Sequence, residues 1–229
     1  MTLRAYHSPV RDEGAEKTRG RILAAAIKHL RAKGAGGFSL DAVAQKAKVT
    51  RLTVYNQFGS RRVLLEAVFD DYAVRGGLTR LGEVMAGPDP RAGLSRLVEI
   101  FCDFWSFDHE PFASLLAMGG ADAEFETALR ARNERRRRLI GALVARQVER
   151  GEVAAAAAAG LTDVLFALTS FPFYAELARG RSPQYAREQV QLLAGLAVAQ
   201  AMDEPAPAKA SRKRRAGLEP PGKASRKNP

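Results

Sequence analysis

The sequence has a single cysteine, few histidines and no long uninterrupted apolar run. One thiol, Cys102, excludes an intramolecular disulfide and a zinc site built from several cysteines. The most apolar stretch, residues 161–177, is interrupted by Asp163 and Glu176, so it is too short and too polar to cross a bilayer. The first 21 residues hold charges but lack the apolar segment of a signal peptide. We therefore expect a cytoplasmic protein with no membrane partner.

Signatures of catalysis are also missing from the chain. There is no P-loop, no Gly-rich dinucleotide loop and no nucleophile elbow in the sequence. His109 lies between Asp108 and Glu110, but adjacent residues on a loop rarely converge on one metal ion. Cys102 could act as a redox sensor, although a buried inert thiol is the simpler interpretation. We expect a protein that is not an enzyme and that binds no cofactor and no metal.

Positive charge is abundant, and it is placed unevenly. The net charge of the chain is +11, and residues 17–62 alone hold eleven Lys and Arg against one acid. Residues 205–229 hold eight Lys and Arg against one acid, whereas residues 63–204 hold fifteen Arg, no Lys and twenty acids. A basic segment of such density indicates a polyanionic partner, most often nucleic acid. For the tail, a merely solubilising surface is an equally good interpretation.

The sequence predicts an all-α fold, because alternating strand patterns are absent and Ala, Leu and Arg are frequent. Thr18, Ser39, Thr50 and Ser60 are candidate N-caps for the first four helices. Pro172 is expected to kink a helix that follows the alanine run 154–159. The predicted helices cover about residues 18–33, 40–46, 51–58, 61–72, 91–106, 111–119, 122–150, 160–179 and 183–202. Residues 1–16 and 205–229 are expected to be a disordered arm and a disordered basic tail.

The second and third predicted helices have the spacing of a helix-turn-helix, whose second helix enters the major groove of DNA. In the segment 50–58, Val54 and Phe58 are four residues apart and are expected to pack inward. Arg51 suits guanine, Asn56 suits adenine, and Leu52 or Thr53 can contact a thymine methyl group. Phosphate contacts are predicted for the remaining polar residues around this helix. These are Lys48, Thr50, Tyr55 and Arg61.

At this point the sequence resembles a known family. The strings FSLDAVA (38–44), AKVT (47–50) and TVYNQFGSR (53–61) are similar to the DNA-binding signature of TetR-family regulators. Its hallmarks are a Tyr three residues before a Phe, followed by a Ser and a basic residue that opens the next helix. The resemblance covers about residues 18–68. It implies that residues 17–62 are a three-helix DNA-binding domain and residues 63–204 a ligand-binding and dimerisation domain.

The sequence departs from the family pattern at three positions. Lys48 stands in the turn where the family usually has Gly, which a left-handed backbone would favour. Leu52 replaces a small residue, so base preference is expected to be unusual. Arg62 replaces an acid in the first turn of the fourth helix, which is unfavourable to the helix dipole but adds positive charge beside DNA.

The resemblance implies a homodimer that binds double-stranded DNA and responds to a small-molecule effector of unknown identity. The family usually dimerises through its last two long helices, which match residues 161–179 and 183–202 here. The expected interface residues are Leu165, Leu192, Leu193, Leu196 and Ala199. Packing within one chain would produce the same apolar pattern. Repression is the direction of regulation that the resemblance implies.

Aromatic and soft apolar residues of the middle helices are candidates for an effector pocket, although each one alone fits an ordinary core equally well. They are Phe101, Trp105, Phe112, Met118, Phe166, Phe173 and Tyr174. The run of arginines at 135–138 usually marks a solvated face. The apolar line of the same helix nevertheless predicts that Arg132 or Arg136 faces inward and pairs with an acid such as Asp103 or with an anionic ligand.

A second function class remains open from the sequence. A non-specific nucleic-acid-binding or compaction protein would also use a basic head and a basic tail. The two classes differ in selectivity, because a regulator binds one palindromic site far better than bulk DNA and a compaction protein does not.

Overall fold

The computed structural model describes residues 9–203, and within them it contains helices and turns but no strand. The all-α prediction is therefore confirmed. The α-helices are α1 (Pro9–Lys33), α2 (Leu40–Ala47), α3 (Arg51–Phe58), α4 (Arg61–Arg75), α5 (Leu81–Ala86), α6 (Pro90–Ser106), α7 (His109–Ala117), α8 (Ala123–Glu149), α9 (Ala158–Leu168), α10 (Phe171–Ala178) and α11 (Pro183–Asp203). Two short 3₁₀ helices, Leu78–Arg80 and Met118–Ala121, complete the set. The predicted basic tail and the first eight residues lie outside the described residues.

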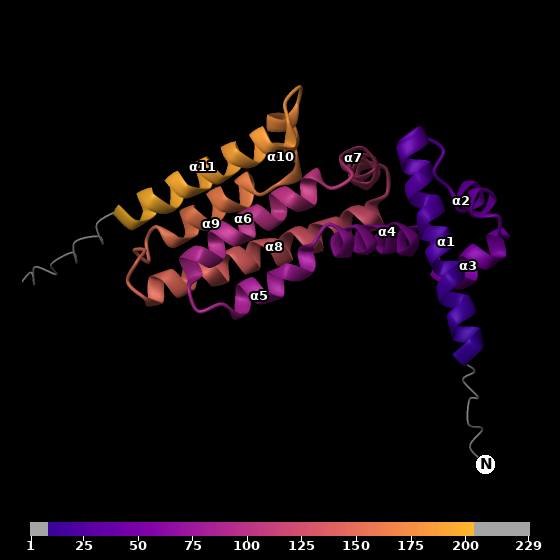
Figure 1. Ribbon diagram of the computed structural model, residues 1–229, viewed down its shortest axis with the longest axis horizontal. Helices are drawn as coiled ribbons and strands as arrows, with labels where there is room; N and C mark the ends of the chain where they lie inside the picture. Colours follow the sequence, from indigo (N-terminus) through magenta and orange to yellow (C-terminus); the bar gives the residue numbers. More distant parts are fainter. Residues whose placement is uncertain (1–8, 204–229) are drawn as a thin grey trace, which may run out of the picture.

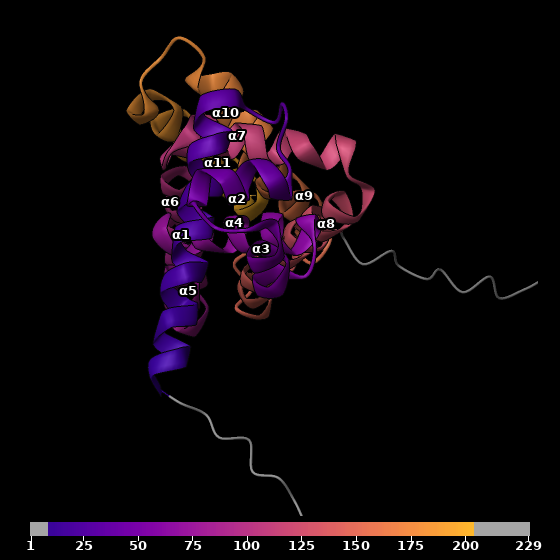
Figure 2. The same ribbon diagram turned by 90° about the vertical axis from the view of Figure 1, so that its right-hand side faces the viewer.

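The molecule is elongated, with α1, α2 and α3 at one end and a helical body at the other (Figure 1). Helix α4 begins directly after α3 and runs into the body, where α6, α8, α9 and α11 form a bundle (Figure 1). Seen from the α1–α3 end, these three helices lie in front of the body helices (Figure 2). One continuous apolar core runs through both parts, from Ile22 and Val54 to Leu143 and Ala186.

Serine and threonine caps set the starts of the short helices at the N-terminal end. Ser39 accepts a hydrogen bond from the Ala42 amide, and Ser60 accepts one from the Val63 amide. Each cap satisfies a backbone donor that the first turn of a helix leaves without a partner. Both predicted caps are therefore confirmed.

Helix α1 is longer than the sequence indicated. Thr18 does not cap it: the helix begins at Pro9, and the Thr18 hydroxyl donates to the Gly14 carbonyl one turn earlier. Residues 9–16 were expected to belong to a disordered arm, and this expectation is wrong. Lys17 pairs with Glu13 at 2.6 Å across one turn, an (i, i+4) pair that favours the helix.

One predicted helix of the body is interrupted close to the expected kink at Pro172. The predicted helix that follows the alanine run and ends near residue 179 is two helices, α9 and α10, whose axes differ by 51°. The Ser170 hydroxyl accepts from the Phe173 amide and starts α10, and Pro172 occupies its first turn, where proline needs no hydrogen-bond partner. In residues 9–203 no single helix has the length and apolarity to cross a membrane, whereas α9 and α10 taken together as a bent pair pass that test.

Aromatic side chains form the centre of the body core. Phe104 packs edge-on against Phe112 at 5.0 Å between ring centroids and lies 4.6 Å from Trp105. Phe69 and Tyr72 of α4 contact Phe112 at 5.5 and 5.4 Å. Edge-to-face aromatic pairs at such distances stabilise a core beyond the burial of their area. This cluster fixes α4, which leads to the N-terminal end, against α6 and α7.

Candidate functional site

The turn between α2 and α3 gives the N-terminal end its helix-turn-helix geometry. Lys48 ends α2 with a left-handed backbone (φ 56°, ψ 46°), and its amide donates to the carbonyl of Gln45. The Thr50 hydroxyl accepts from the Thr53 amide at 3.0 Å and starts α3. The predicted left-handed position is therefore confirmed, and it is occupied by a residue for which this conformation costs energy.

Helix α3 has one face in the core and one face in solvent. Val54 and Phe58 are buried against α1 and α2, as predicted. The guanidinium of Arg19 in α1 lies 4.3 Å above the Phe58 ring and donates to the Gln57 carbonyl at 3.0 Å. These contacts hold the inner side of α3. They leave Leu52 and Tyr55 on the outer side, 65% and 56% exposed.

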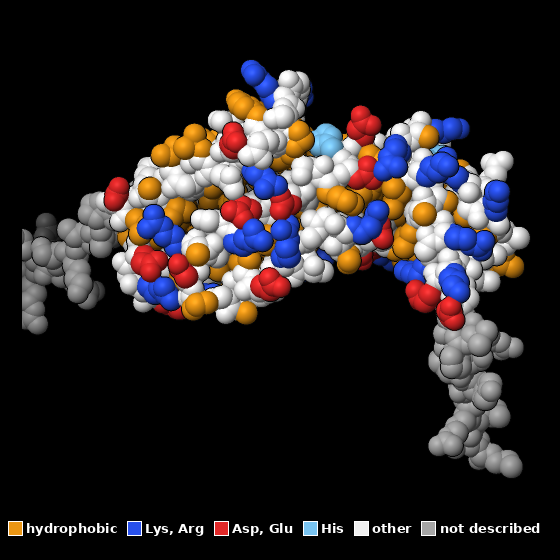
Figure 3. All heavy atoms as spheres, in the orientation of Figure 1, with side chains coloured by type: hydrophobic (Ala, Val, Ile, Leu, Met, Phe, Trp, Pro, Cys, Tyr) orange, Lys and Arg blue, Asp and Glu red, His pale blue; other side chains and the backbone are white. Residues whose placement is uncertain are grey.

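The other predicted DNA-contacting residues surround that outer face. Lys48, Thr50, Arg51 and Asn56 are exposed, and Thr53 is half-buried. Arg51 lies 3.2 Å from Asp41, but both side chains are mostly in solvent, where an ion pair stabilises little. Lys and Arg side chains gather over this end of the molecule (Figure 3). The guanidinium of Arg51 is thus available to an external partner.

Arg61 has a different position from the other candidates. Its guanidinium pairs with Asp122, which also caps α8, and it donates to the Phe38 carbonyl at 3.4 Å. This ion pair joins the start of α4 to the start of α8. A phosphate contact by Arg61 stays a prediction, and it would compete with an intramolecular partner.

Arg62, which follows it, has two acidic neighbours. It pairs with Glu66 in the next turn of α4 and lies 3.1 Å from a Glu124 oxygen at the start of α8. These carboxylates offset the unfavourable position of a cation in the first turn of a helix.

A second polar joint connects the two parts of the molecule. Arg31 near the end of α1 donates to both carboxylate oxygens of Asp108, at 2.6 and 2.5 Å. Tyr72 of α4 donates to the same carboxylate at 3.0 Å. Burial, and next the hydrogen bond to Asp108, raise the pKa of the Tyr72 hydroxyl, which therefore stays a donor at neutral pH. Asp108 itself has a positive φ of 47°, which is costly for a residue with a side chain.

A half-open cavity of about 230 Å³ lies in the body between α4, α6 and α8. Its apolar wall is largely aromatic and comes from Phe69, Phe101, Phe104 and Trp105. The wall contributed by α8 is polar. Its residues are Arg132, Asn133, Arg135 and Arg136. The cavity thus combines flat apolar surfaces with a concentration of guanidinium groups.

Arg136 is buried, with 5% of its surface exposed. Its Nη1 donates to the Thr169 carbonyl, which also accepts from the Trp105 indole at 2.9 Å. The guanidinium lies 4.3 Å from the Phe166 ring centroid and 5.6 Å from that of Phe101. Among the described residues no carboxylate pairs with it, and burial, followed by the nearby Arg137, lowers the pKa of Arg136 to about 10.

The inward-facing arginine that the sequence predicted is therefore Arg136. Asp103, its expected acidic partner, does not pair with it. Asp103 instead pairs with Arg187 of α11 and with Arg80 at 2.8 Å. Arg132 pairs with Asp70 at 2.7 Å. The sequence could not reveal this, because Asp103 and its two partners come from segments that only the tertiary fold brings together.

Only some of the predicted pocket residues line this cavity. Phe101, Trp105 and Arg136 line the cavity, and Phe112 and Phe166 contact Trp105 and Arg136 from outside it. The remaining three line no part of this cavity: Met118, Phe173 and Tyr174.

The sequence analysis missed the wall contributed by α4 and the segment after it. Its members are Phe69, Asp70, Ala73, Leu78 and Leu81. A signal was present, because α4 has apolar residues over a wide arc and not on a single stripe. Such an arc indicates a helix packed on two sides.

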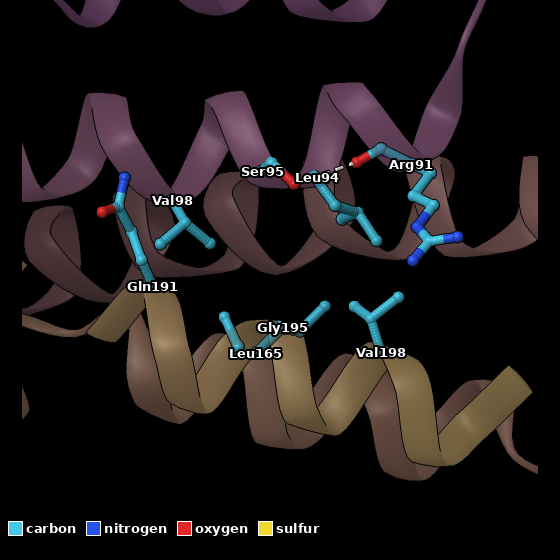
Figure 4. Close-up of a pocket in the computed structure, with 9 residues that line it drawn as sticks. Arg91, Leu94, Ser95, Val98, Leu165, Gln191, Gly195 and Val198 are labelled. Carbon is cyan, nitrogen blue, oxygen red and sulfur yellow. Dashed lines mark hydrogen bonds between the residues drawn. The ribbon is translucent and has the colours of Figure 1, made fainter. Parts of the chain in front are cut away.

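A second cavity of about 190 Å³ lies between α6, α9 and α11 (Figure 4). Leu94 and Val98 of α6 point toward α11, which lines the opposite side with Gln191, Gly195 and Val198 (Figure 4). The Ser95 hydroxyl donates a hydrogen bond to the Arg91 carbonyl. This cavity therefore lacks the buried unpaired charge that distinguishes the one beside α4.

Helix α11 exposes an apolar row on the side away from the core. Leu192, Leu193 and Leu196 are 56%, 38% and 58% exposed, and Ala199 continues the row. Hydrophobic side chains follow the upper edge of the body over α11 (Figure 3). The fifth predicted interface residue, Leu165, is buried in the core of its own chain at 1% exposure. It offers no surface to a partner, so this expectation is corrected.

Comparisons with known proteins agree with this geometry. Residues 22–68 match the family described as bacterial regulatory proteins, tetR family. No curated protein matches the chain in sequence. Among the described residues, no group of three or more His, Cys, Asp or Glu side chains could hold a metal ion.

Several solved structures share the fold. A putatively assigned TetR-family regulator from Syntrophomonas wolfei has a TM-score of 0.67 and 16% identity, covering 80% of this chain and 96% of its own. A TetR transcription regulator from Haloarcula marismortui has a TM-score of 0.63 and 15% identity, covering 81% and 98%. NalD from Pseudomonas aeruginosa has a TM-score of 0.59 and 22% identity, covering 80% and 96%. Residues 22–68 therefore match the tetR family, and the chain shares its all-α fold with solved structures of TetR-family regulators.

Proposed function

We propose that the protein is a cytoplasmic, ligand-responsive transcriptional repressor that binds a palindromic operator as a homodimer. The observation that carries the proposal is the outer face of α3, where Arg51, Leu52 and Tyr55 are exposed on a helix whose inner side is fixed in the core. A rigid helix with exposed Arg and Asn is suited to base edges in the major groove. NalD, a structural neighbour, is a repressor of a multidrug efflux pump, and repression is proposed here by analogy.

Dimerisation is proposed through α11 and α9. These helices pack against each other, and Val164 of α9, which is 45% exposed, lines a surface hollow together with Ala197 and Gln200 of α11. Two copies of this surface would bury leucines that a monomer leaves in water. A two-fold dimer would also present two recognition helices to successive major grooves, which are about 34 Å apart.

Helix α4 is the proposed connection between effector and DNA. It follows α3 after two residues, it contributes Phe69 to the cavity, and it contributes Tyr72 to the joint at Asp108. A ligand that favours a different position of α4 would change the spacing of the two recognition helices and release the operator.

Genome-wide capture of bound DNA tests the proposal. A regulator is expected to enrich a few palindromic sites, each bound at least a thousandfold more tightly than bulk DNA at physiological salt, which is the usual specificity of such proteins. Sedimentation at micromolar concentration is expected to give a dimer. Uniform enrichment along the chromosome would instead indicate a compaction protein, and monomers throughout would exclude the proposed interface.

A further inference from the structure

The buried guanidinium of Arg136 lacks what a buried charge normally has. Isolated charges are rarely buried in proteins, because removal from water is costly unless an opposite charge compensates. The neighbouring Arg132 has Asp70 and, at 3.6 Å, Glu66. Arg136 has only the Thr169 carbonyl and two aromatic faces. Core packing alone does not explain why this buried guanidinium has no counter-charge.

The free edge of the guanidinium has a defined shape. Nη1 is used by the Thr169 carbonyl, whereas Nε is buried with no hydrogen-bond partner and Nη2 donates to no described residue. In arginine the Nε–H bond and one Nη2–H bond are parallel, so together they form a fork that matches the two oxygens of a carboxylate. Arg132 also has a buried Nε without a partner at the same cavity. The unused donors therefore fit a planar anion.

The rest of the cavity restricts the body of that anion. Phe69, Phe101, Phe104 and Trp105 provide flat apolar surfaces, which suit an aromatic ring. The volume of about 230 Å³ exceeds the roughly 150 Å³ of an apolar protein cavity that holds benzene, and the surplus suits a short acidic arm. Three arginines line the cavity against one acid, Asp70, which is already paired.

We propose that the effector is a small aromatic carboxylate, with its single ring between the aromatic side chains and its carboxylate on the Nε/Nη2 edge of Arg136. This inference rests on the proposed function, because it names the ligand class to which the regulator responds. The carboxylate would supply the counter-charge that the folded protein lacks. The ring would contact Phe69 and so act on α4.

The single tryptophan of the chain makes the test direct. Trp105 lines the cavity, so its fluorescence in the full-length protein reports on occupancy without any DNA present. The probes are benzoate, phenylacetate and 3-phenylpropanoate, each compared with its neutral primary amide. We expect at least one acid to change the Trp105 emission at submillimolar concentration and to bind ten- to a hundredfold more tightly than its amide, as charge-assisted hydrogen bonds to a carboxylate imply.

Substitutions at position 136 distinguish a loss of ligand binding from a loss of folding. Arg136→Met removes the fork at similar length, and the Thr169 carbonyl keeps its bond from Trp105, so the variant is expected to fold and to bind the acid at least tenfold more weakly. Arg136→Lys keeps a charge without the fork and is expected to bind weakly too. Arg138→Met is the matched control, because Arg138 is exposed on the same helix and lines no part of the cavity; its affinity should equal that of the unmodified protein.

Equal binding of acid and amide, full binding by Arg136→Met with an intact circular-dichroism spectrum, or no response to any of the three acids would overturn the inference. None of these results bears on selective DNA binding, which the capture experiment measures separately. Conversely, a protein that binds the acid but enriches no operator would keep its ligand site and lose its proposed regulatory role.

Discussion

The N-terminal end and the body of this protein are stabilised in different ways. Helices α2 and α3 have eight residues each, and hydroxyl caps at Ser39 and Thr50 define where they begin. The body depends on contacts between residues far apart in the chain, such as the aromatic cluster around Phe104 and the pairing of Asp103 with Arg187. Short-range chemistry therefore positions the exposed face of α3, whereas long-range packing shapes the cavity.

The largest effect is expected from the centre of the body. Phe104→Ala removes a fully buried ring that contacts Phe69, Trp105 and Phe112. We expect it to lower the free energy of unfolding by about 3–5 kcal/mol, as for other large-to-small core substitutions. Chemical denaturation measures this value.

Phe107→Ala is the comparison variant for that measurement, because Phe107 is only half-buried at the end of α6. We expect a smaller loss for it. A loss below about 1 kcal/mol for Phe104→Ala would mean that the body does not depend on its aromatic centre.

The next effect concerns base recognition at the other end. Arg51→Ala removes the exposed guanidinium at the start of α3, so we expect it to reduce discrimination at one base pair by about 1–3 kcal/mol while leaving the fold intact. Competition binding with operators substituted at single positions measures the loss. Arg138→Ala, an exposed change in the body, serves as control. An unchanged preference in Arg51→Ala would remove this residue from the base-reading set.

The next prediction concerns the ion pair of Arg61, which lies where the two regions meet. Because it pairs with Asp122, a double-mutant cycle of Arg61→Ala and Asp122→Asn is expected to give a coupling energy of about 1 kcal/mol in unfolding measurements. The Asn substitution retains a side-chain oxygen that can cap α8.

The same variants distinguish this joint from a phosphate contact. If Arg61 also binds a phosphate, Arg61→Ala reduces the slope of log affinity against log salt by about 1, whereas Asp122→Asn does not. Additive effects on stability together with a lower salt slope would assign Arg61 to DNA alone.

The smallest effect concerns the turn before α3. Lys48→Gly is expected to stabilise the protein by about 1 kcal/mol, since glycine adopts a positive φ without the steric cost of a side chain. For a chain of this size that is a rise in Tm of about 2–4 °C. Lys46→Gly, at an exposed position in the last turn of α2, should lower Tm instead, because glycine has a lower helix propensity than lysine. Equal shifts in both variants would contradict the role of backbone geometry at Lys48.

The same comparison explains what the sequence could predict. The caps at Ser39, Thr50 and Ser60 and the buried pair Val54 and Phe58 follow from local chemistry, and the structure confirms them. The early start of α1 was missed, because Thr18 is a good cap residue in isolation and its hydroxyl bonds instead within a longer helix.

The cavity was only half predictable for a related reason. The α6 residues Phe101 and Trp105 lie on a helix with a clear apolar face, and Arg136 lies close to the apolar line of α8 formed by Phe125, Leu139 and Leu143. The acid partners of Arg80 and Arg132 and the burial of Leu165 depend on which helices become neighbours. No pattern within a single helix contains that information.

The carbonyl of Thr169 has a consequence for how this protein can change over generations. Two donors on separate helices, Trp105 and Arg136, share this one acceptor, so loss of either leaves it satisfied. Because an orphaned buried acceptor is the main penalty of such a loss, position 136 can be exchanged at little cost to folding. The lining of the cavity can therefore diverge among descendants of this chain while their architecture is inherited unchanged.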